Sequence, residues 1–361
     1  MRIIQIIDSL EAGGAERMAV NYANALSKNI AFSGLVVSRK EGLLVNQIDD
    51  SVPYLFLKKR KKIDLQAVFT LRKYIKKNKV EVIHAHSSSF FTAVLVKLTL
   101  PKIKIIWHDH YGISQDLYAR KNLSLKLGSF FFTGIISVNS ALKDWAASYL
   151  WCSDIVYFPN FIVDSKSGQK QNLNGSEDKR IICVANLRPQ KNHELLLEAA
   201  NLLKNKFPDW TYHLFGKDFE DSYSKILKQK VMDLDLQETI FFYGTTTNVG
   251  SALEQCQIAV LTSVSEGLPL AVLEYGLYKL PVVATNVGEI SKIITSGKEG
   301  LIVEPDNLKE FAGAIEKLIV SGKYRDEMAL ELYNKVQLNF SESAIVKEYL
   351  LWLKSLLTFT V

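Results

Sequence analysis

Two glutamates eight residues apart, Glu266 and Glu274, form the most specific ligand-binding pattern in this sequence of 361 residues. Their segment reads Ser265-Glu266-Gly267-Leu268-Pro269-Leu270-Ala271-Val272-Leu273-Glu274. Pro269 suits the first position of a helix, so Glu266 would precede this helix and Glu274 would lie inside it. One carboxylate could accept sugar hydroxyls and the other ribose hydroxyls, beside the N–H groups of Gly267–Leu270. The alternative is a charged cap plus an exposed glutamate. The apolar neighbours disfavour it, because they indicate burial and a buried glutamate needs partners.

Two cations and two glycines follow predicted strands. Arg188 and Lys191 come after the apolar run Ile181–Ala185 and could neutralise a diphosphate, Arg as a fork and Lys as a point charge. Gly13 and Gly14 open a predicted helix, where a phosphate could approach free backbone N–H groups. A solvated loop is the alternative for the cations. A tight structural turn is the alternative for the glycines, because their pattern lacks a third glycine.

Four of the six histidines form two His-x-His pairs, His84 with His86 and His108 with His110, each at the end of a predicted strand. Such pairs can bind zinc or hydrogen-bond to sugar and phosphate oxygens. We expect His84 and His86 to be structural and His110 to be functional, with His108 a weaker candidate for an acceptor or sugar contact. A metal-dependent hydrolase is the rival interpretation, but it would need further ligands on later strands. We therefore predict no metal site.

Two other patterns are expected to be structural. Asp233-Leu234-Asp235 matches the Asp-x-Asp pattern of metal-dependent sugar transferases, but it lies between a predicted helix and strand, as a turn does. Cys152, Cys183 and Cys256 are too few for a disulfide framework and lack the paired spacing of a zinc site. We expect buried thiols in a reducing compartment.

Short runs of Ile and Val alternate with amphipathic stretches, which is typical of parallel sheets with crossover helices. The strands expected in the first half are Ile3–Ile7, Gly34–Val37, Val80–Ile83, Ile103–Trp107 and Ile135–Val138. Those expected in the second half are Ile181–Ala185, Thr211–Phe215, Ile240–Tyr243, Ile258–Leu261 and Val282–Ala284. The predicted fold class is α/β, with two Rossmann-like doubly wound domains facing a central cleft.

The domain boundaries follow from composition. We expect an N-terminal Rossmann-like domain over 1–162, a polar linker over 163–179 and a C-terminal Rossmann-like domain over 180–340. A final helix over 341–361 could pack back on the N-terminal domain.

Positive charge is concentrated in the first half of the chain. Residues 1–162 carry a net charge of +10, whereas the remainder carries −4, and 58–79 holds ten Lys and Arg with Asp64 as its one acid. Contact with an anionic membrane surface and a solvated helix face are both compatible with this cluster, and no nucleic-acid-binding motif accompanies it. We expect no signal peptide and no spanning segment, hence a cytoplasmic protein that is soluble or peripheral on the inner face of the cell membrane.

Taken together, the motifs resemble glycosyltransferase family 4, whose members have the GT-B architecture. The resemblance runs nearly the whole length and rests on Gly13-Gly14, His110, Pro159-Asn160, Arg188, Lys191, Glu266, Glu274 and Gly288-Glu289-Ile290.

The resemblance implies a retaining, metal-independent hexosyltransferase without a cofactor. It would use a UDP- or GDP-sugar and a glycan or lipid-linked acceptor, in bacterial cell-surface polysaccharide synthesis. Arg188 and Lys191 would hold the donor diphosphate, Glu266 the transferred sugar and Glu274 the ribose. The remaining implied contacts are Gly13, Gly14, Gly267, Leu268 and Leu270 along the donor, and His110 near the sugar. The alternative is a catalytically silent nucleotide-sugar-binding protein.

Overall fold

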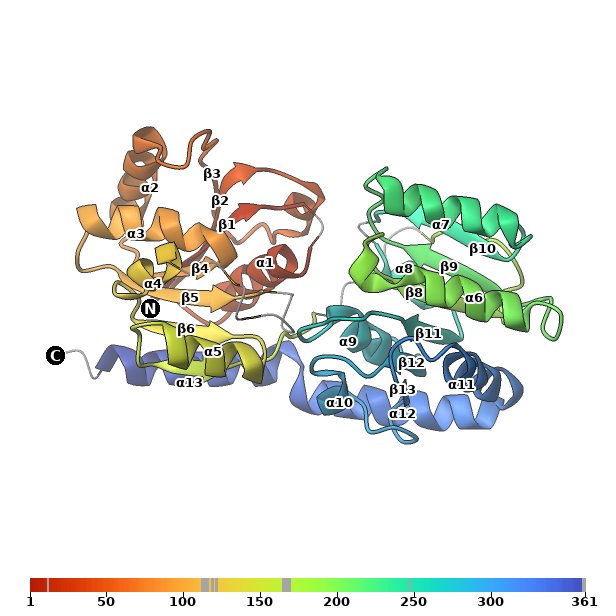
Figure 1. Ribbon diagram of the computed structural model, residues 1–361. Helices are drawn as coiled ribbons and strands as arrows, with labels where there is room; N and C mark the ends of the chain where they lie inside the picture. Colours follow the sequence, from red (N-terminus) through yellow and green to blue (C-terminus); the bar gives the residue numbers. More distant parts are fainter. Residues whose placement is uncertain are drawn as a thin grey trace. The chain divides into compact units, whose positions relative to one another are not determined.

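The chain forms two compact units, each built on one parallel sheet (Figure 1). Unit 1 comprises Met1–Phe161 and Glu342–Val361, and unit 2 comprises Ile162–Ser341. The computed structural model describes residues 1–11, 13–111, 117, 120, 123–163, 170–246 and 248–358. The predicted α/β class with two Rossmann-like domains is confirmed.

Unit 1 contains a seven-stranded sheet in the order β3-β2-β1-β4-β5-β6-β7. Its strands are β1 (Arg2–Ser9), β2 (Phe32–Lys40), β3 (Tyr54–Phe56), β4 (Val82–His86), β5 (Lys104–Asp109), β6 (Gly134–Ser137) and β7 (Ile155–Tyr157). The central strands are buried Ile- and Val-rich runs, as expected for strands covered on both faces. The edge strands β3 and β7 were not expected from the sequence.

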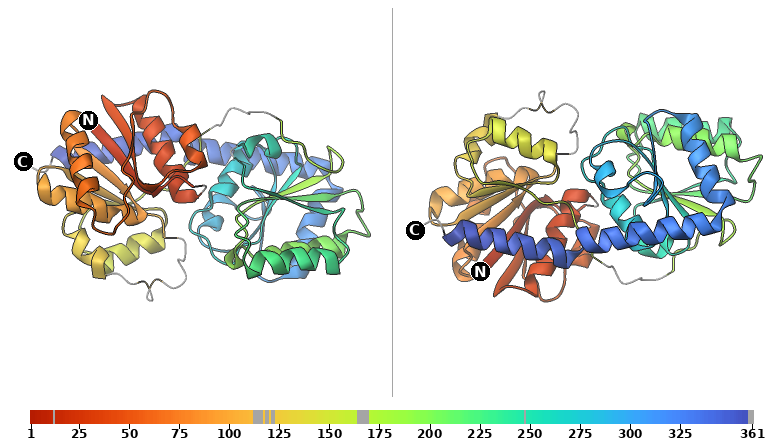
Figure 2. Two further views of the ribbon diagram at one scale, coloured as in Figure 1. Left: turned by 90° about the horizontal axis from the view of Figure 1, so that it is seen from above. Right: turned by 90° about the horizontal axis from the view of Figure 1, so that it is seen from below.

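The helices of unit 1 lie on both faces of its sheet (Figure 2). They are α1 (Gly14–Ser27), α2 (Leu65–Lys77), α3 (Phe90–Thr99), α4 (Leu123–Ser129), α5 (Ser140–Tyr149) and α13 (Glu342–Thr358). Side chains of α2, α3, α4 and α5 share one apolar core, and α1 packs into another. The chain's final helix, α13, lies beside α1, where the ring of Tyr349 is centred 5.2 Å from that of Tyr22.

Unit 2 contains a six-stranded sheet in the order β10-β9-β8-β11-β12-β13. Its strands are β8 (Arg180–Val184), β9 (Thr211–Phe215), β10 (Ile240–Gly244), β11 (Ile258–Leu261), β12 (Val282–Thr285) and β13 (Leu301–Val303). Its helices are α6 (His193–Leu203), α7 (Ser222–Asp233), α8 (Gly250–Leu253), α9 (Leu270–Leu277), α10 (Ile290–Ile293), α11 (Leu308–Val320) and α12 (Gly322–Asn339). Helix α6 contacts α7 and α11, whereas α9 contacts α10 and α12.

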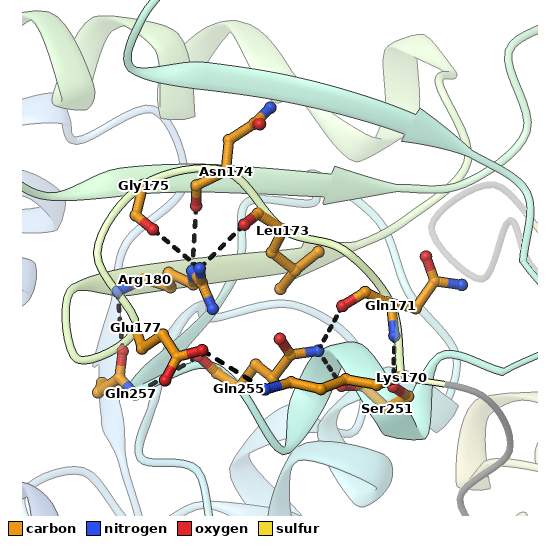
Figure 3. Close-up of polar contacts among 10 residues, drawn as sticks. All are labelled: Lys170, Gln171, Leu173, Asn174, Gly175, Glu177, Arg180, Ser251, Gln255 and Gln257. Carbon is orange, nitrogen blue, oxygen red and sulfur yellow. Dashed lines mark hydrogen bonds and ion pairs between the residues drawn. The ribbon is translucent and has the colours of Figure 1, made fainter.

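The polar segment 170–179, expected to be part of a linker, is bound to unit 2 (Figure 3). The Arg180 side chain donates to the backbone oxygens of Leu173, Asn174 and Gly175 at 2.8–3.0 Å. The backbone N–H of Gln171 donates to Ser251 Oγ at 2.8 Å. A buried guanidinium needs acceptors, and this loop supplies them, so the polar composition serves internal hydrogen bonds. Residues 164–169 lie outside the described part.

In each sheet the strands are added first toward one edge and then, from the middle, toward the other edge. The point where this order reverses is where ligands are expected to bind. The change falls between β1 and β4 in unit 1 and between β8 and β11 in unit 2. In open parallel sheets, ligands bind outside the carboxyl ends of the strands at this point. Among the described residues, no helix is both long and apolar enough to cross a bilayer.

Candidate functional site

An ion pair between Lys191 and Glu266 lies at the crevice position of unit 2. Lys191 follows β8 and Glu266 follows β11. The Lys191 ammonium lies 2.5 Å from Glu266 Oε1. The two side chains are 19% and 9% exposed, so the pair is largely shielded from water. Two sequence-predicted residues 75 positions apart are therefore brought together by the adjacency of their strands.

Hydroxyl groups and one glycine hold the loop that carries Glu266. Ser263 Oγ donates to Glu266 Oε1 at 2.6 Å, and Thr285 Oγ1 donates to the Ser263 backbone oxygen at 2.5 Å. Gly288 has φ +58, and a Cβ there would lie 2.2 Å from the Glu266 backbone oxygen, so this position requires glycine. The carboxylate is consequently fixed from three strand ends, those of β8, β11 and β12.

Arg188 lies on the same loop as Lys191, but it is exposed. Its guanidinium lies over the Phe219 ring, 4.5 Å from the ring centroid, which restricts the side chain without neutralising it. The backbone between the two cations forms a 3₁₀ turn over Pro189–Lys191, followed by Asn192 at φ +46. Arg188 therefore remains available to an anion in solution.

The second glutamate, Glu274, lies inside α9 and is partly buried. Pro269 is the residue before this helix and Leu270 is its first residue, so the prediction that Pro269 opens the helix was off by one position. Leu268 is 4% exposed, whereas Gly267 and Leu270 are partly exposed. The backbone between Gly267 and Leu270 is therefore more accessible to a ligand than the Leu268 side chain is.

Gly13 and Gly14 begin α1 of unit 1, as predicted, and Arg17 N donates to the Gly13 backbone oxygen at 3.0 Å. The Glu16 carboxylate lies so close to Gly13 that an added Cβ would be 2.3 Å from its Oε2. Burial raises the pKa of Glu16 above its usual value. This helix start therefore already has an acidic side chain beside it.

The four paired histidines form one stacked group in unit 1. The His84 and His86 rings are centred 4.5 Å apart, and those of His108 and His110 4.0 Å apart. His84 Nε2 lies 3.1 Å from His108 Nδ1, and His86 Nδ1 lies 2.9 Å from His110 Nε2. His108 is 1% exposed, which argues against a direct contact with a ligand, whereas His110 reaches the surface.

Burial keeps these imidazoles uncharged. It lowers the pKa of both His84 and His110 to about 3. At neutral pH the neutral His110 ring can therefore both donate and accept a hydrogen bond, but its lowered pKa makes it too weak a base to take up a second proton.

The group His84, His86 and His108 is the one cluster with metal-ligand character among the described residues, its ligand atoms lying within 4.8 Å of one another. The ring planes of His84 and His108 are inclined by only 14°, and their nitrogens face each other as a hydrogen-bonded pair. This arrangement suits a hydrogen-bonded stack better than ligands aimed at one tetrahedral centre.

Several structurally important residues were missed by sequence reasoning. Arg120 makes a bidentate pair with buried Asp109, at 2.6 and 2.9 Å, and no spacing rule indicates this pairing. Ser263, which orients Glu266, is one serine among many. Gln5 had a usable signal, because it is the one polar residue within the buried apolar run of β1.

Asp233 ends α7 and Asp235 has φ +49, so the Asp-x-Asp pattern forms a helix-exit turn, as predicted. It lies at the amino end of β10, away from the strand ends that carry Lys191 and Glu266. All three cysteines are free and buried, as predicted.

Comparison with known proteins gives consistent results for both halves. Residues 12–166 match the model of glycosyltransferase family 4, and residues 164–334 match that of glycosyl transferases group 1. An Escherichia coli UDP-Gal:alpha-D-GlcNAc-diphosphoundecaprenol alpha-1,3-galactosyltransferase is 23% identical over 357 residues, covering 91% of this chain and 90% of the relative. A Campylobacter jejuni GalNAc-alpha-(1->4)-GalNAc-alpha-(1->3)-diNAcBac-PP-undecaprenol alpha-1,4-N-acetyl-D-galactosaminyltransferase is 24% identical over 379 residues, covering 97% of each chain.

Among solved structures, Anabaena HepE in complex with UDP and glucose superposes with a TM-score of 0.84 at 18% identity, covering 98% of this chain and 100% of HepE. The chain therefore shares the fold of HepE. The matched models, which together extend over residues 12–334, show that the chain belongs to glycosyltransferase family 4 and is a glycosyltransferase.

Proposed function

We propose that this glycosyltransferase moves a hexose from a UDP- or GDP-sugar to a glycan or lipid-linked acceptor in bacterial cell-surface polysaccharide synthesis. The observation that carries the proposal is the Lys191–Glu266 pair beside the exposed Arg188, at the crevice position of the unit 2 sheet. The names of the two bacterial relatives, which specify undecaprenyl-diphosphate-linked acceptors, support the acceptor class.

In this proposal each unit 2 residue meets one part of the donor. Arg188 and Lys191 bind the diphosphate, Glu266 accepts hydroxyls of the transferred sugar and Glu274 accepts ribose hydroxyls. Backbone N–H groups between Gly267 and Leu270 add further donors at the start of α9. In unit 1, Gly13 and Gly14 allow a ligand phosphate to approach the start of α1, and His110 contacts a sugar hydroxyl.

We also propose that transfer retains the anomeric configuration without a covalent intermediate on Glu266. Glu266 Oε1 already accepts from the Lys191 ammonium and the Ser263 hydroxyl. A carboxylate engaged in this way is a poorer nucleophile than a free one and a good fixed acceptor for hydroxyls.

Loss of either cation should slow transfer. We expect Arg188→Ala and Lys191→Ala each to lower kcat/KM roughly 30- to 1,000-fold, equivalent to about 2–4 kcal/mol of transition-state stabilisation. The measurement is release of nucleoside diphosphate from a UDP- or GDP-sugar, with and without acceptor. Lys225→Ala, at an exposed cation of α7 in the same unit, is the matched control.

Thermal unfolding separates the two variants. Lys191→Ala should lower the melting temperature because it leaves buried Glu266 without its cation, whereas exposed Arg188→Ala should not. Near-normal turnover in both variants would contradict the assignment. Donor binding by the wild type without any diphosphate release would favour a catalytically silent binding protein.

The two glutamates should differ in which part of the donor they serve. Glu266→Gln should weaken binding of the intact nucleotide sugar roughly tenfold or more relative to binding of the free nucleoside diphosphate. Glu274→Gln should weaken binding of both the nucleotide sugar and the free nucleoside diphosphate. Calorimetric titration with UDP, GDP and their sugars measures this, with Glu238→Gln, exposed in the same unit, as control. Normal binding of free nucleotide by Glu274→Gln would refute the ribose assignment.

We propose that no metal takes part, because Arg188 and Lys191 can compensate diphosphate charge. Activity should therefore be unchanged after incubation with excess EDTA and removal of the chelate. Complete loss of activity, restored by Mn²⁺ or Zn²⁺, would overturn this proposal. In that case His84, His86 and His108 would become the first ligands to test.

We further propose that the enzyme works as a peripheral protein on the cytoplasmic face of an anionic membrane. The surface concerned, here the basic face, comprises Lys58, Arg60, Lys61, Lys62, Arg72, Lys73, Lys76, Lys77 and Lys79. Ile63, Leu65 and Phe69 lie among these cations and are 58–66% exposed, which supports contact with lipid. Lys59 is excluded, because it is 6% exposed and donates to Thr92 Oγ1 at 2.7 Å.

Removing charge from the basic face should weaken membrane binding specifically. Each cation near an anionic surface contributes about 1 kcal/mol, so replacing Lys58, Arg60, Lys61 and Lys62 by Gln should reduce vesicle binding by roughly three orders of magnitude at low salt. Co-sedimentation with anionic and neutral vesicles over a salt series measures this. Replacing Lys225, Lys309, Lys317 and Lys323 of unit 2 removes the same charge and serves as control. Equal recovery with neutral and anionic vesicles at low salt would defeat the proposal.

A further inference from the structure

One hydrogen-bonded line links the interior of unit 1 to His110. His86 Nε2 lies 2.8 Å from Gln5 Oε1, and His86 Nδ1 lies 2.9 Å from His110 Nε2. Gln5 and His86 are both 0% exposed, whereas His110 is partly exposed at the end of the line. Water therefore cannot substitute for either inner partner.

The direction of each hydrogen bond follows from the atom at the inner end. The Gln5 amide lies with Oε1 toward His86, and a carbonyl oxygen only accepts, so in this orientation His86 carries its proton on Nε2. A neutral imidazole has one N–H, so His86 Nδ1 is bare and accepts from His110 Nε2–H. His110 then has its own Nδ1 bare. Its outer nitrogen is an acceptor, suited to a ligand hydroxyl that donates.

The neighbouring histidine pair lacks such a fixed end. His84 Nε2 and His108 Nδ1 face each other at 3.1 Å, but within the described residues His84 Nδ1 and His108 Nε2 have no hydrogen-bond partner. Either tautomer of that pair satisfies the contact. Among these histidines, the donor and acceptor roles are therefore fixed only in the Gln5–His86–His110 series of hydrogen bonds.

We propose that Gln5 and His86 are positioning residues that lock His110 in the Nε2–H tautomer, so that His110 Nδ1 accepts a hydrogen bond from a substrate hydroxyl. This inference rests on the proposed role of His110, but the tautomer itself is a property of the free protein. The planes of the His86 and His110 rings are inclined by only 20°, and this near-parallel stacking restricts rotation of the His110 ring. The other tautomer of His110 would carry its proton on Nδ1. It would then present an N–H donor to the substrate hydroxyl and could not accept a hydrogen bond from it.

The tautomer is measured directly by two-bond ¹H–¹⁵N correlation on the full chain labelled with [¹⁵N]histidine, since protonated and bare ring nitrogens resonate far apart. His110→Asn identifies the signals of His110. We expect His110 to be bare at Nδ1 in the wild type and a tautomer mixture in Gln5→Met, with kcat/KM lowered roughly 10- to 100-fold. Gln5→Glu, measured at a pH where its carboxylate is ionised and therefore only accepts, should keep the wild-type tautomer.

Tyr22→Phe is the matched control, because Tyr22 is fully buried against the His84 and His86 rings but its hydroxyl is outside the line. It should leave tautomer and turnover unchanged. A proton on His110 Nδ1 in the wild type would mean that the Gln5 amide is reversed, and it would overturn the proposal. An unchanged tautomer in Gln5→Met would overturn it too. A changed tautomer with normal turnover would instead remove His110 from the proposed function while leaving the lock intact.

Discussion

The adjacency of β8 and β11 is the constraint on which the candidate donor site depends. Paired residues of these strands are 77 positions apart in sequence, yet the strands pair in parallel, with Val260 opposite Cys183. The loops that follow the two strands consequently begin side by side at the carboxyl edge of the sheet. One carries Lys191 and the other Glu266. The Ser263 hydroxyl and the glycine at position 288 hold the loop that carries Glu266 in place.

Unit 1 has the same strand order around β1 and β4, but its crevice position is filled differently. There the inward-facing polar groups are neutral imidazoles and an amide, stacked and hydrogen-bonded to one another. Buried neutral groups with partners cost far less than buried charges. The two units therefore share one topology but differ at the point where the strand order reverses: an ion pair lies there in unit 2, whereas the histidines and Gln5 of unit 1 form uncharged hydrogen bonds beside the Asp109–Arg120 pair at the end of β5.

Much of this arrangement could be predicted from the sequence, for definite physical reasons. Ile- and Val-rich runs mark the central strands, and residues placed just after such runs must lie at the carboxyl edge. The strands β3, β7 and β13 were missed because three residues are too few for periodicity, and their structure depends on pairing at a sheet edge. The Lys191–Glu266 pair was missed because strand order is decided by tertiary packing. The segment 170–179 was misjudged because composition does not distinguish a linker from a loop bound to buried Arg180.

The Lys191–Glu266 pair also changes the electrostatic argument for the donor site. Two cations considered alone would give a charge of +2, but the buried carboxylate reduces the local charge to +1. Lys191 is thus compensated when no donor is bound, and an empty site does not leave an unpaired charge in a low-dielectric environment. In the proposed function, the Lys191 ammonium has three N–H groups and could contact a diphosphate while keeping Glu266. Exposed Arg188 could turn toward the anion at little desolvation cost. The proposed site would thus bind and release a charged donor without separating its own buried charges.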